Sequence, residues 1–152
     1  MQRNNIINEY CVSSHLKDYF SKEILTWFSK NKRKLPWRTR ISQDNFSYLV
    51  FVSEFMLQQT QVKTVIPYFE RFVEKWPSLK SLAKANNNEI LMFWQGLGYY
   101  SRGRNLLKSA KIIASDFNGK IPINEDELKK LPGIGDYTAA AIRSIAFNKK
   151  AV

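Results

Sequence analysis

The segment from Phe46 to Leu57 most narrowly limits how this chain can fold, because it is apolar on nearly every side of a helix. A helix with one apolar stripe can lie on a surface, but a helix that is apolar all round has to be buried. Other elements must therefore surround this segment. We expect it to be the central helix of the fold.

The rest of the chain has helical periodicity too, and no segment alternates convincingly between apolar and polar residues as a strand would. Ser78, Asn88 and Asn124 can each cap the start of a helix, and Asn124 has Glu127 three residues later. The basic run from Lys30 to Arg38 is typical of a connection. Besides the central segment, the pattern predicts helices over residues 16–27, 62–76, 78–85, 88–96, 106–114 and 124–131, and from 136 onward. The fold class is therefore all-α, with seven or eight short helices.

Lysine and arginine number 24 against 13 aspartates and glutamates, which gives a net charge of +11. This excess favours a polyanionic partner, nucleic acid before a membrane surface, although a basic surface that serves only solubility is the alternative. The single Cys11 excludes a disulfide framework and a multi-cysteine metal site within this chain. We find no signal peptide and no apolar run near the ~18 residues of a membrane span. A soluble protein of a reducing, intracellular compartment is expected.

The stretch "LPGIGDYTAAAI", residues 131–142, places a proline and two glycines directly before a helix of small residues. Without Cβ atoms at Gly133 and Gly135, a phosphate can approach the backbone around Ile134. The free N–H groups and the positive dipole end of the following helix would then point at it. This pattern predicts a helix–hairpin–helix that grips a nucleic-acid backbone without reading its sequence. A plain glycine-rich turn between helices is the alternative.

The stretch "SEFMLQQTQV", residues 53–62, places Glu54 on the most apolar helix of the chain. A carboxyl group in that setting should have a raised pKa, as a general acid that works near neutral pH requires. The alternative is a glutamate at the helix rim that points to water or pairs with an arginine. At the helix end, the amides of Gln58, Gln59 and Gln61 can bond base edges or fill the space left by an extruded base.

The stretch "GLGYYSRGRN", residues 96–105, joins the adjacent rings of Tyr99 and Tyr100 to two guanidinium groups. Aromatic rings can wedge into a base stack, while Arg102 and Arg104 hold phosphates. The alternative is a tyrosine pair that belongs to the hydrophobic core.

These motifs, together with "LPWR" at residues 35–38, occur in the order found in the A/G-specific adenine DNA glycosylases. From about residue 20 to 152, the chain resembles this MutY family of the helix–hairpin–helix DNA glycosylase superfamily. The resemblance implies an incomplete six-helix barrel domain over residues 41–152, with the helix–hairpin–helix at 125–145. It assigns residues 1–40, an N-terminal helix and a connection, to the family's second, cluster-bearing lobe.

The resemblance also implies a reaction and a role for particular residues. The family removes adenine mispaired with 8-oxoguanine or guanine from double-stranded DNA, after flipping the adenine out of the duplex. Glu54 would protonate the leaving adenine and handle the attacking water, and Tyr137 would lie beside the reaction centre. Gln59 and Tyr99 would form the wedge near the lesion pair. The adenine pocket would be lined by Leu35, Trp37, Arg38 and Leu57.

Two departures from the family pattern affect these expectations. The connection over residues 39–48 is longer by about four residues and lacks a Pro-Tyr pair, which affects where Arg38 is placed. In the family, the second catalytic aspartate and the four cysteines of a 4Fe-4S cluster follow after the point that Val152 reaches. The chain is therefore expected to be the N-terminal part of such an enzyme, inactive alone. The resemblance further implies a monomer in the cytoplasm, associated with a bacterial nucleoid through DNA.

Two other functions stay open at this point. An endonuclease III-like glycosylase with lyase activity uses a lysine at the position that Tyr137 occupies, and a phenol cannot form the Schiff base which that chemistry needs. Tyr137 therefore favours a glycosylase without lyase activity. From a different class, the chain could be a non-enzymatic DNA-binding module that uses only its hairpin and its basic surface.

Overall fold

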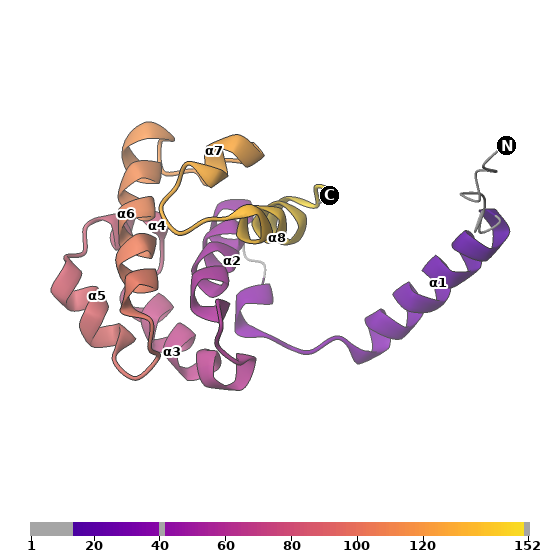
Figure 1. Ribbon diagram of the computed structural model, residues 1–152. Helices are drawn as coiled ribbons and strands as arrows, with labels where there is room; N and C mark the ends of the chain where they lie inside the picture. Colours follow the sequence, from indigo (N-terminus) through magenta and orange to yellow (C-terminus); the bar gives the residue numbers. More distant parts are fainter. Residues whose placement is uncertain (1–13, 40–41, 151–152) are drawn as a thin grey trace, which may run out of the picture. The chain divides into compact units, whose positions relative to one another are not determined.

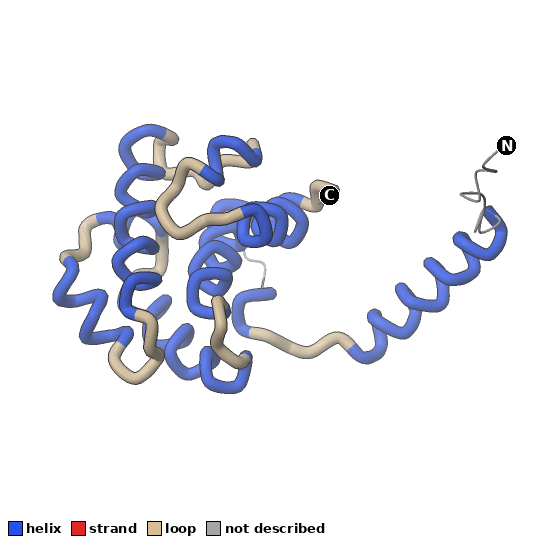
Figure 2. Tube along the Cα trace, viewed as in Figure 1, coloured by secondary structure: helices blue, strands red, loops and turns tan. Residues whose placement is uncertain are grey.

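A computed structural model describes residues 14–39 and 42–150 of the chain, so Cys11 and Val152 lie outside the described residues. Helices and loops make up this part of the protein, without strands (Figure 2). The chain divides into two compact units, Met1–Lys34 and Leu35–Val152. The described elements are α1 (Ser14–Asn31), the 3₁₀ helix η1 (Pro36–Arg38), α2 (Gln43–Leu57), α3 (Val62–Lys75), α4 (Leu79–Ala83), α5 (Asn87–Trp94), α6 (Tyr100–Asp116), α7 (Glu125–Lys129) and α8 (Asp136–Phe147).

Helix α2 is the centre of the larger unit, as its apolar circumference predicts. Every residue from Ser47 to Met56 is buried. The helix contacts η1, α3, α6 and α8, and Figure 1 shows it between α8 and α3. Because α2 is enclosed on all sides, a polar group on it can reach solvent only where the surrounding helices leave an opening. Glu54 lies at such an opening.

Side-chain caps set the starts of several helices. Ser78 accepts the N–H of Ser81, and Asn124 accepts the N–H groups of Asp126 and Glu127, so both predicted caps are confirmed. The predicted cap at Asn88 is wrong. Asn86 caps α5 instead: its side chain accepts the N–H of Glu89, and the Glu89 carboxylate accepts the N–H of Asn86, which makes a capping box.

The boundary between the two compact units lies between Lys34 and Leu35. Leu35 and Trp37 are buried in the core of the larger unit, and the Trp37 ring packs edge-on against Phe69 with the centroids 5.2 Å apart. The "LPWR" segment therefore belongs to the unit that contains α2. The predicted one-sided helix over residues 16–27 is present as α1, and it is longer at both ends.

Candidate active site and DNA interface

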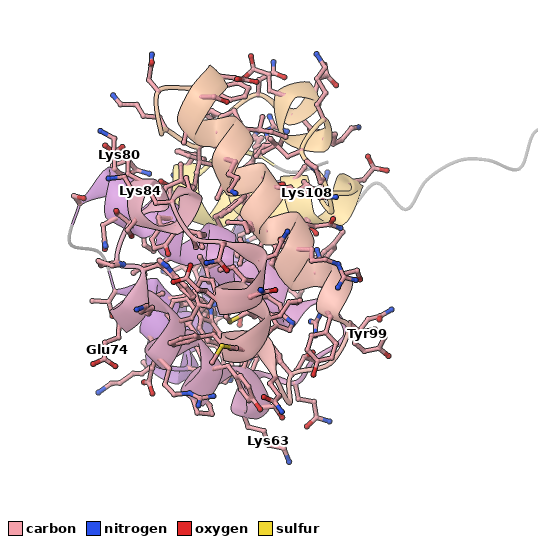
Figure 3. All side chains as sticks on the ribbon, turned by 90° about the vertical axis from the view of Figure 1, so that its left-hand side faces the viewer. Lys63, Glu74, Lys80, Lys84, Tyr99 and Lys108 are labelled. Carbon is pink, nitrogen blue, oxygen red and sulfur yellow. The ribbon has the colours of Figure 1, made fainter. Side chains whose placement is uncertain are left out.

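Three of the sequence motifs meet at one cavity of about 590 Å³. The end of α2, the start of α6 and the hairpin before α8 each form one wall. Figure 3 shows Tyr99 at the edge of the molecule, on the side opposite Glu74. The lining residues are Glu54, Leu57, Gln58, Gln59, Tyr99, Ser101, Arg102, Gly133, Tyr137 and Thr138.

Glu54 is the titratable group on the α2 wall whose pKa is most altered. Its side chain is buried, with 8% of the residue exposed. Burial raises the pKa of Glu54 to about 7, and the positive charge of Arg38 opposes part of this rise. At neutral pH the carboxyl group is therefore divided between its acid and base forms, which suits a proton donor.

The four residues expected to line an adenine pocket lie in different places. Leu57 is on the cavity wall. Leu35 and Trp37 are buried in the core, and neither is among the residues that line the cavity, so their adenine-pocket role stays a prediction. Arg38, on the same 3₁₀ turn, lies outside the lining set but close enough to lower the pKa of Glu54 by its charge.

The amides after Glu54 have separate positions. Gln58 Nε2 donates to the Gly133 carbonyl at 3.1 Å and to Thr138 Oγ1 at 3.3 Å, so this side chain joins the end of α2 to the hairpin. Its amide nitrogen is therefore already bonded within the protein. Gln59 is exposed and has a left-handed backbone, with a φ of 58°.

The tyrosine pair lies at the surface. Tyr99 is 62% exposed and Tyr100 is 42% exposed, so the alternative in which both belong to the core is wrong. Tyr99 also has a left-handed backbone, with a φ of 49°. Arg104 is exposed, as a phosphate ligand would be.

Arg102 differs from the prediction. Only 6% of the residue is exposed, and its guanidinium donates to backbone carbonyls at the end of α2 and in the loop before α6. A guanidinium used in this way is not available to a phosphate. In this structure, Arg102 therefore joins the end of α2 to the loop before α6 rather than presenting its guanidinium at the surface.

The two hairpin glycines are needed for different reasons. Gly133 has a φ of +83°, and a Cβ there would lie 2.9 Å from Phe55 Cε1 and from Asn105 Cβ. A Cβ at Gly135 would have no atom within 4 Å, so this position is open toward solvent. Ile134 is buried, and its N–H already donates to the Leu131 carbonyl. Of the three predicted backbone ligands, Ile134 is thus buried, whereas Gly133 and Gly135 are exposed.

Asp136 begins α8, and its carboxylate pairs with Lys129 across the hairpin, with Nζ and Oδ1 2.9 Å apart. The hydrogen bond to Asp136 raises the pKa of Lys129. Gly135 is the N-cap residue, and Asp136 is the first residue of the helix. The aspartate therefore places a negative charge where the helix dipole favours an anion.

Comparison with known proteins places the fold in a family. Residues 52–150 match the HhH-GPD superfamily base excision DNA repair protein family. The chain belongs to the HhH-GPD superfamily. The all-α helix–hairpin–helix glycosylase fold predicted from the sequence is thereby confirmed.

Relatives within the HhH-GPD superfamily include an adenine DNA glycosylase of Rattus norvegicus, 45% identical over 150 residues, which span 94% of this chain and 29% of that protein. An adenine DNA glycosylase of Buchnera aphidicola subsp. Schizaphis graminum is 47% identical over 130 residues, which span 85% of this chain and 36% of the relative. The chain thus spans about a third of the length of these relatives.

Solved structures show the same HhH-GPD fold. A thermostable thymine-DNA glycosylase is 28% identical, with a TM-score of 0.75 over 88% of this chain and 60% of that chain. An endonuclease III–DNA complex is 23% identical, with a TM-score of 0.69 over 90% of this chain and 61% of that chain. At that identity, the second likeness supports the fold alone.

The residues of this chain do not fit the iron–sulfur cluster implied by the resemblance. A 4Fe-4S cluster is held by four cysteine thiolates, and the sequence contains one cysteine. Within the described ranges, no group of three or more His, Cys, Asp or Glu side chains could hold a metal ion. None of the helices in those ranges has the length and apolarity needed to cross a membrane.

Ser101 and Thr138 line the cavity but are not among the predicted site residues. Thr138 follows Tyr137 in the first turn of α8, so the hairpin motif could have indicated it. Ser101 lies beside the tyrosine pair in the first turn of α6. No pattern in the sequence distinguishes it from an ordinary exposed serine.

Proposed function

We propose that this protein acts in base excision repair and hydrolyses the N-glycosidic bond of adenine mispaired with 8-oxoguanine or guanine. The observation that carries the proposal is a buried carboxyl group with a pKa of about 7 at the cavity where three motifs meet. Similarity to adenine DNA glycosylases supports adenine as the released base. Double-stranded DNA with these mispairs is the proposed partner, and a cytoplasmic location at the nucleoid follows from the same proposal.

The proposed reaction begins when the adenine leaves the base stack and enters the cavity, because the glycosidic bond cannot be reached inside a duplex. Glu54 then donates its proton to a ring nitrogen of the adenine. The bond between the sugar C1′ and the adenine N9 breaks with its electron pair going to the base, through a state with oxocarbenium character. A water molecule adds to C1′ and returns a proton to the Glu54 carboxylate.

The developing sugar cation also needs an anion close to it. Among the described residues that line the cavity, Glu54 alone is acidic. Asp136 does not fill that place, because its side chain is 88% exposed and paired with Lys129. We therefore expect this chain by itself to bind duplex DNA and to release no adenine.

Tyr137 supports hydrolysis without strand cleavage. It lies in the first turn of α8, lines the cavity and is 82% exposed. A lyase needs an amine to form a Schiff base with the sugar, and a phenol cannot form one. The product would be an abasic site in an intact strand.

In the same proposal, Gly135 and Arg104 contact the DNA backbone, while Gln59 and Tyr99 enter the base stack near the mispair. The backbone contacts are independent of sequence and should supply most of the affinity. The wedge residues lie outside the hairpin: Gln59 follows the end of α2, and Tyr99 precedes α6. Binding and base extrusion would thus depend on different elements.

The test joins this chain to the remaining part of the Buchnera relative and measures adenine release from an A:8-oxoguanine duplex in single turnover. Glu54→Gln keeps the size of the side chain but cannot donate the proton, so release should fall at least a thousandfold while duplex binding stays within about threefold. Glu89→Gln, in the cap of α5, is the matched control and should leave release unchanged.

Release by Glu54→Gln within tenfold of the parent, roughly 1.4 kcal/mol of barrier, would refute the role of Glu54. Strand cleavage without alkali would favour the lyase alternative.

A further inference from the structure

Arg102 occupies an unusual position between the two loops that carry the wedge residues. It stands in the first turn of α6, and its guanidinium lies among backbone carbonyls rather than at the surface. Nη1 donates to the carbonyls of Met56 at 2.8 Å, Phe55 at 3.4 Å and Gln58, and Nη2 donates to those of Gly98 at 3.0 Å and Leu97 at 3.2 Å.

These carbonyls belong to two segments that are far apart in the sequence. The Nη1 partners are the final carbonyls of α2, which have no acceptor role inside the helix and need a donor from elsewhere. The Nη2 partners are in the loop between α5 and α6. A planar guanidinium can serve both segments at once because its donors form a rigid fork. Arg102 therefore ties the end of α2 to the start of α6.

Each tied segment is followed directly by a strained residue. Gln59 comes after the bonded carbonyl of Gln58, and Tyr99 comes after the bonded carbonyl of Gly98. Both have a left-handed backbone. The other non-glycine residues with positive φ in the described ranges are Asn118 and Asn148, and asparagine tolerates this conformation far better than glutamine or tyrosine.

Such strain persists only where neighbouring groups fix it. The Arg102 guanidinium supplies that constraint one residue away from each strained position. It also lies over the Tyr99 ring, with Cζ 5.3 Å from the centroid, so it holds the side chain as well as the backbone.

We propose that Arg102 is a positioning residue that holds Gln59 and Tyr99 as a preformed pair at the cavity rim, ready to enter a base stack. The entry into DNA rests on the proposed function, whereas the holding of the two loops rests on the contacts alone. Because the pair is ordered before DNA arrives, binding does not have to order it.

The first test is hydrogen exchange on this chain and its Arg102→Lys variant. Lysine keeps the positive charge but lacks the fork, so amides at residues 57–60 and 97–101 should exchange at least tenfold faster, with α3 unchanged. Leu82→Ala, in the core at α4, is the control for general destabilisation and should not single out these two segments. Unchanged exchange at either segment in Arg102→Lys would overturn the proposal.

The second test measures entry into DNA by the fluorescence of 2-aminopurine placed beside the adenine of an A:8-oxoguanine duplex. At saturating protein, the parent and Leu82→Ala should raise the fluorescence equally, and Arg102→Lys should give at most a third of that rise. A full rise with Arg102→Lys would overturn the proposal. If the parent raises no fluorescence, the proposed function is refuted instead. The hydrogen-exchange comparison then decides whether Arg102 holds the two loops.

A third variant addresses the case in which Arg102→Lys does not fold. Glycine at both strained positions removes the need for a constraint, so the triple variant Gln59→Gly, Tyr99→Gly, Arg102→Lys should fold. The double glycine variant with Arg102 intact is its matched control. If the control folds and the triple variant does not, the link between Arg102 and the strained pair is refuted.

Discussion

The end of α2 and the hairpin with the first turn of α8 line the same cavity, yet their residues differ in how exposed they are. At the α2 wall, Glu54 is buried, with 8% of the residue exposed, and Arg102 of α6, which bonds to the end of α2, is 6% exposed. At the hairpin wall, Tyr137 is 82% exposed and Gly135 faces open space. A general acid needs desolvation to raise its pKa. Binding of the DNA backbone needs N–H groups that a phosphate can reach. A site that does both therefore needs one buried wall and one exposed wall.

The same contrast occurs within the hairpin itself, between its two glycines. Gly133 faces inward against Phe55 of α2 and Asn105 of α6, while Gly135 faces outward. The inward glycine joins the hairpin to the buried wall. The outward glycine belongs to the proposed DNA interface.

Substitution of the two glycines by alanine should separate these roles and gives the largest expected effect. Gly133→Ala introduces a left-handed non-glycine residue and a Cβ at 2.9 Å from Phe55. Strain and crowding together should lower the free energy of unfolding by about 3–4 kcal/mol. Gly135→Ala should change it by less than about 1 kcal/mol but weaken duplex binding severalfold. Urea unfolding and fluorescence-anisotropy titration measure the two quantities.

Equal loss of stability in both variants would mean that the hairpin glycines are not divided in this way. A loss of affinity by Gly135→Ala that is confined to A:8-oxoguanine duplex would also contradict it. In that case the hairpin would read the lesion rather than grip the backbone.

Burial of Glu54 predicts that the stability of the protein depends on pH. The pKa of Glu54 is about 7 in the folded protein and near 4.5 when the chain is unfolded. Between these values the folded protein keeps the proton and the unfolded chain releases it, so the stabilising contribution falls as pH rises and levels off above pH 7. From pH 5 to pH 8, this loss should be about 2–3 kcal/mol.

Glu54→Gln is the reference for this measurement, because it removes the titration and leaves other groups in place. The difference in free energy of unfolding between parent and variant should shift in favour of the variant as pH rises. Parallel pH profiles for the two proteins would show that Glu54 is not buried in the way described.

The sequence predicted most of the fold, because helix formation here depends on local patterns. The apolar circumference of α2 required a central position, and Ser78 and Asn124 marked helix starts through bonds to residues two or three positions on. The motifs at residues 53–62 and 96–105 also predicted Glu54, Gln59 and Tyr99 as site residues. All three line one cavity.

What the sequence could not supply is the direction in which a side chain points when partners lie far along the chain. Its motif predicts a phosphate contact for Arg102, but the acceptors at Phe55 and Met56 are more than 40 residues away. The resemblance assigns Trp37 to a pocket, but this ring packs on Phe69. An arginine or tryptophan in a motif has the same letter whether it faces inward or outward, and only the packing decides.

The smallest expected effect concerns the charge at the hairpin mouth. Asp136 places a carboxylate at the N-terminal end of α8, where we propose that a phosphate binds, and pairs with Lys129. Asp136→Asn should remove the repulsion and free Lys129 for a phosphate, so duplex affinity should rise about threefold at low salt. If Lys129 gains one phosphate contact, the log–log slope of affinity against salt should steepen by about 0.9.

Glu74→Gln makes the same change in net charge on the opposite side of the molecule from Tyr99 and is the matched control (Figure 3). A rise of equal size in both variants would show that net charge alone governs binding, whereas weaker binding by Asp136→Asn would mean that the pair with Lys129 organises the hairpin for DNA.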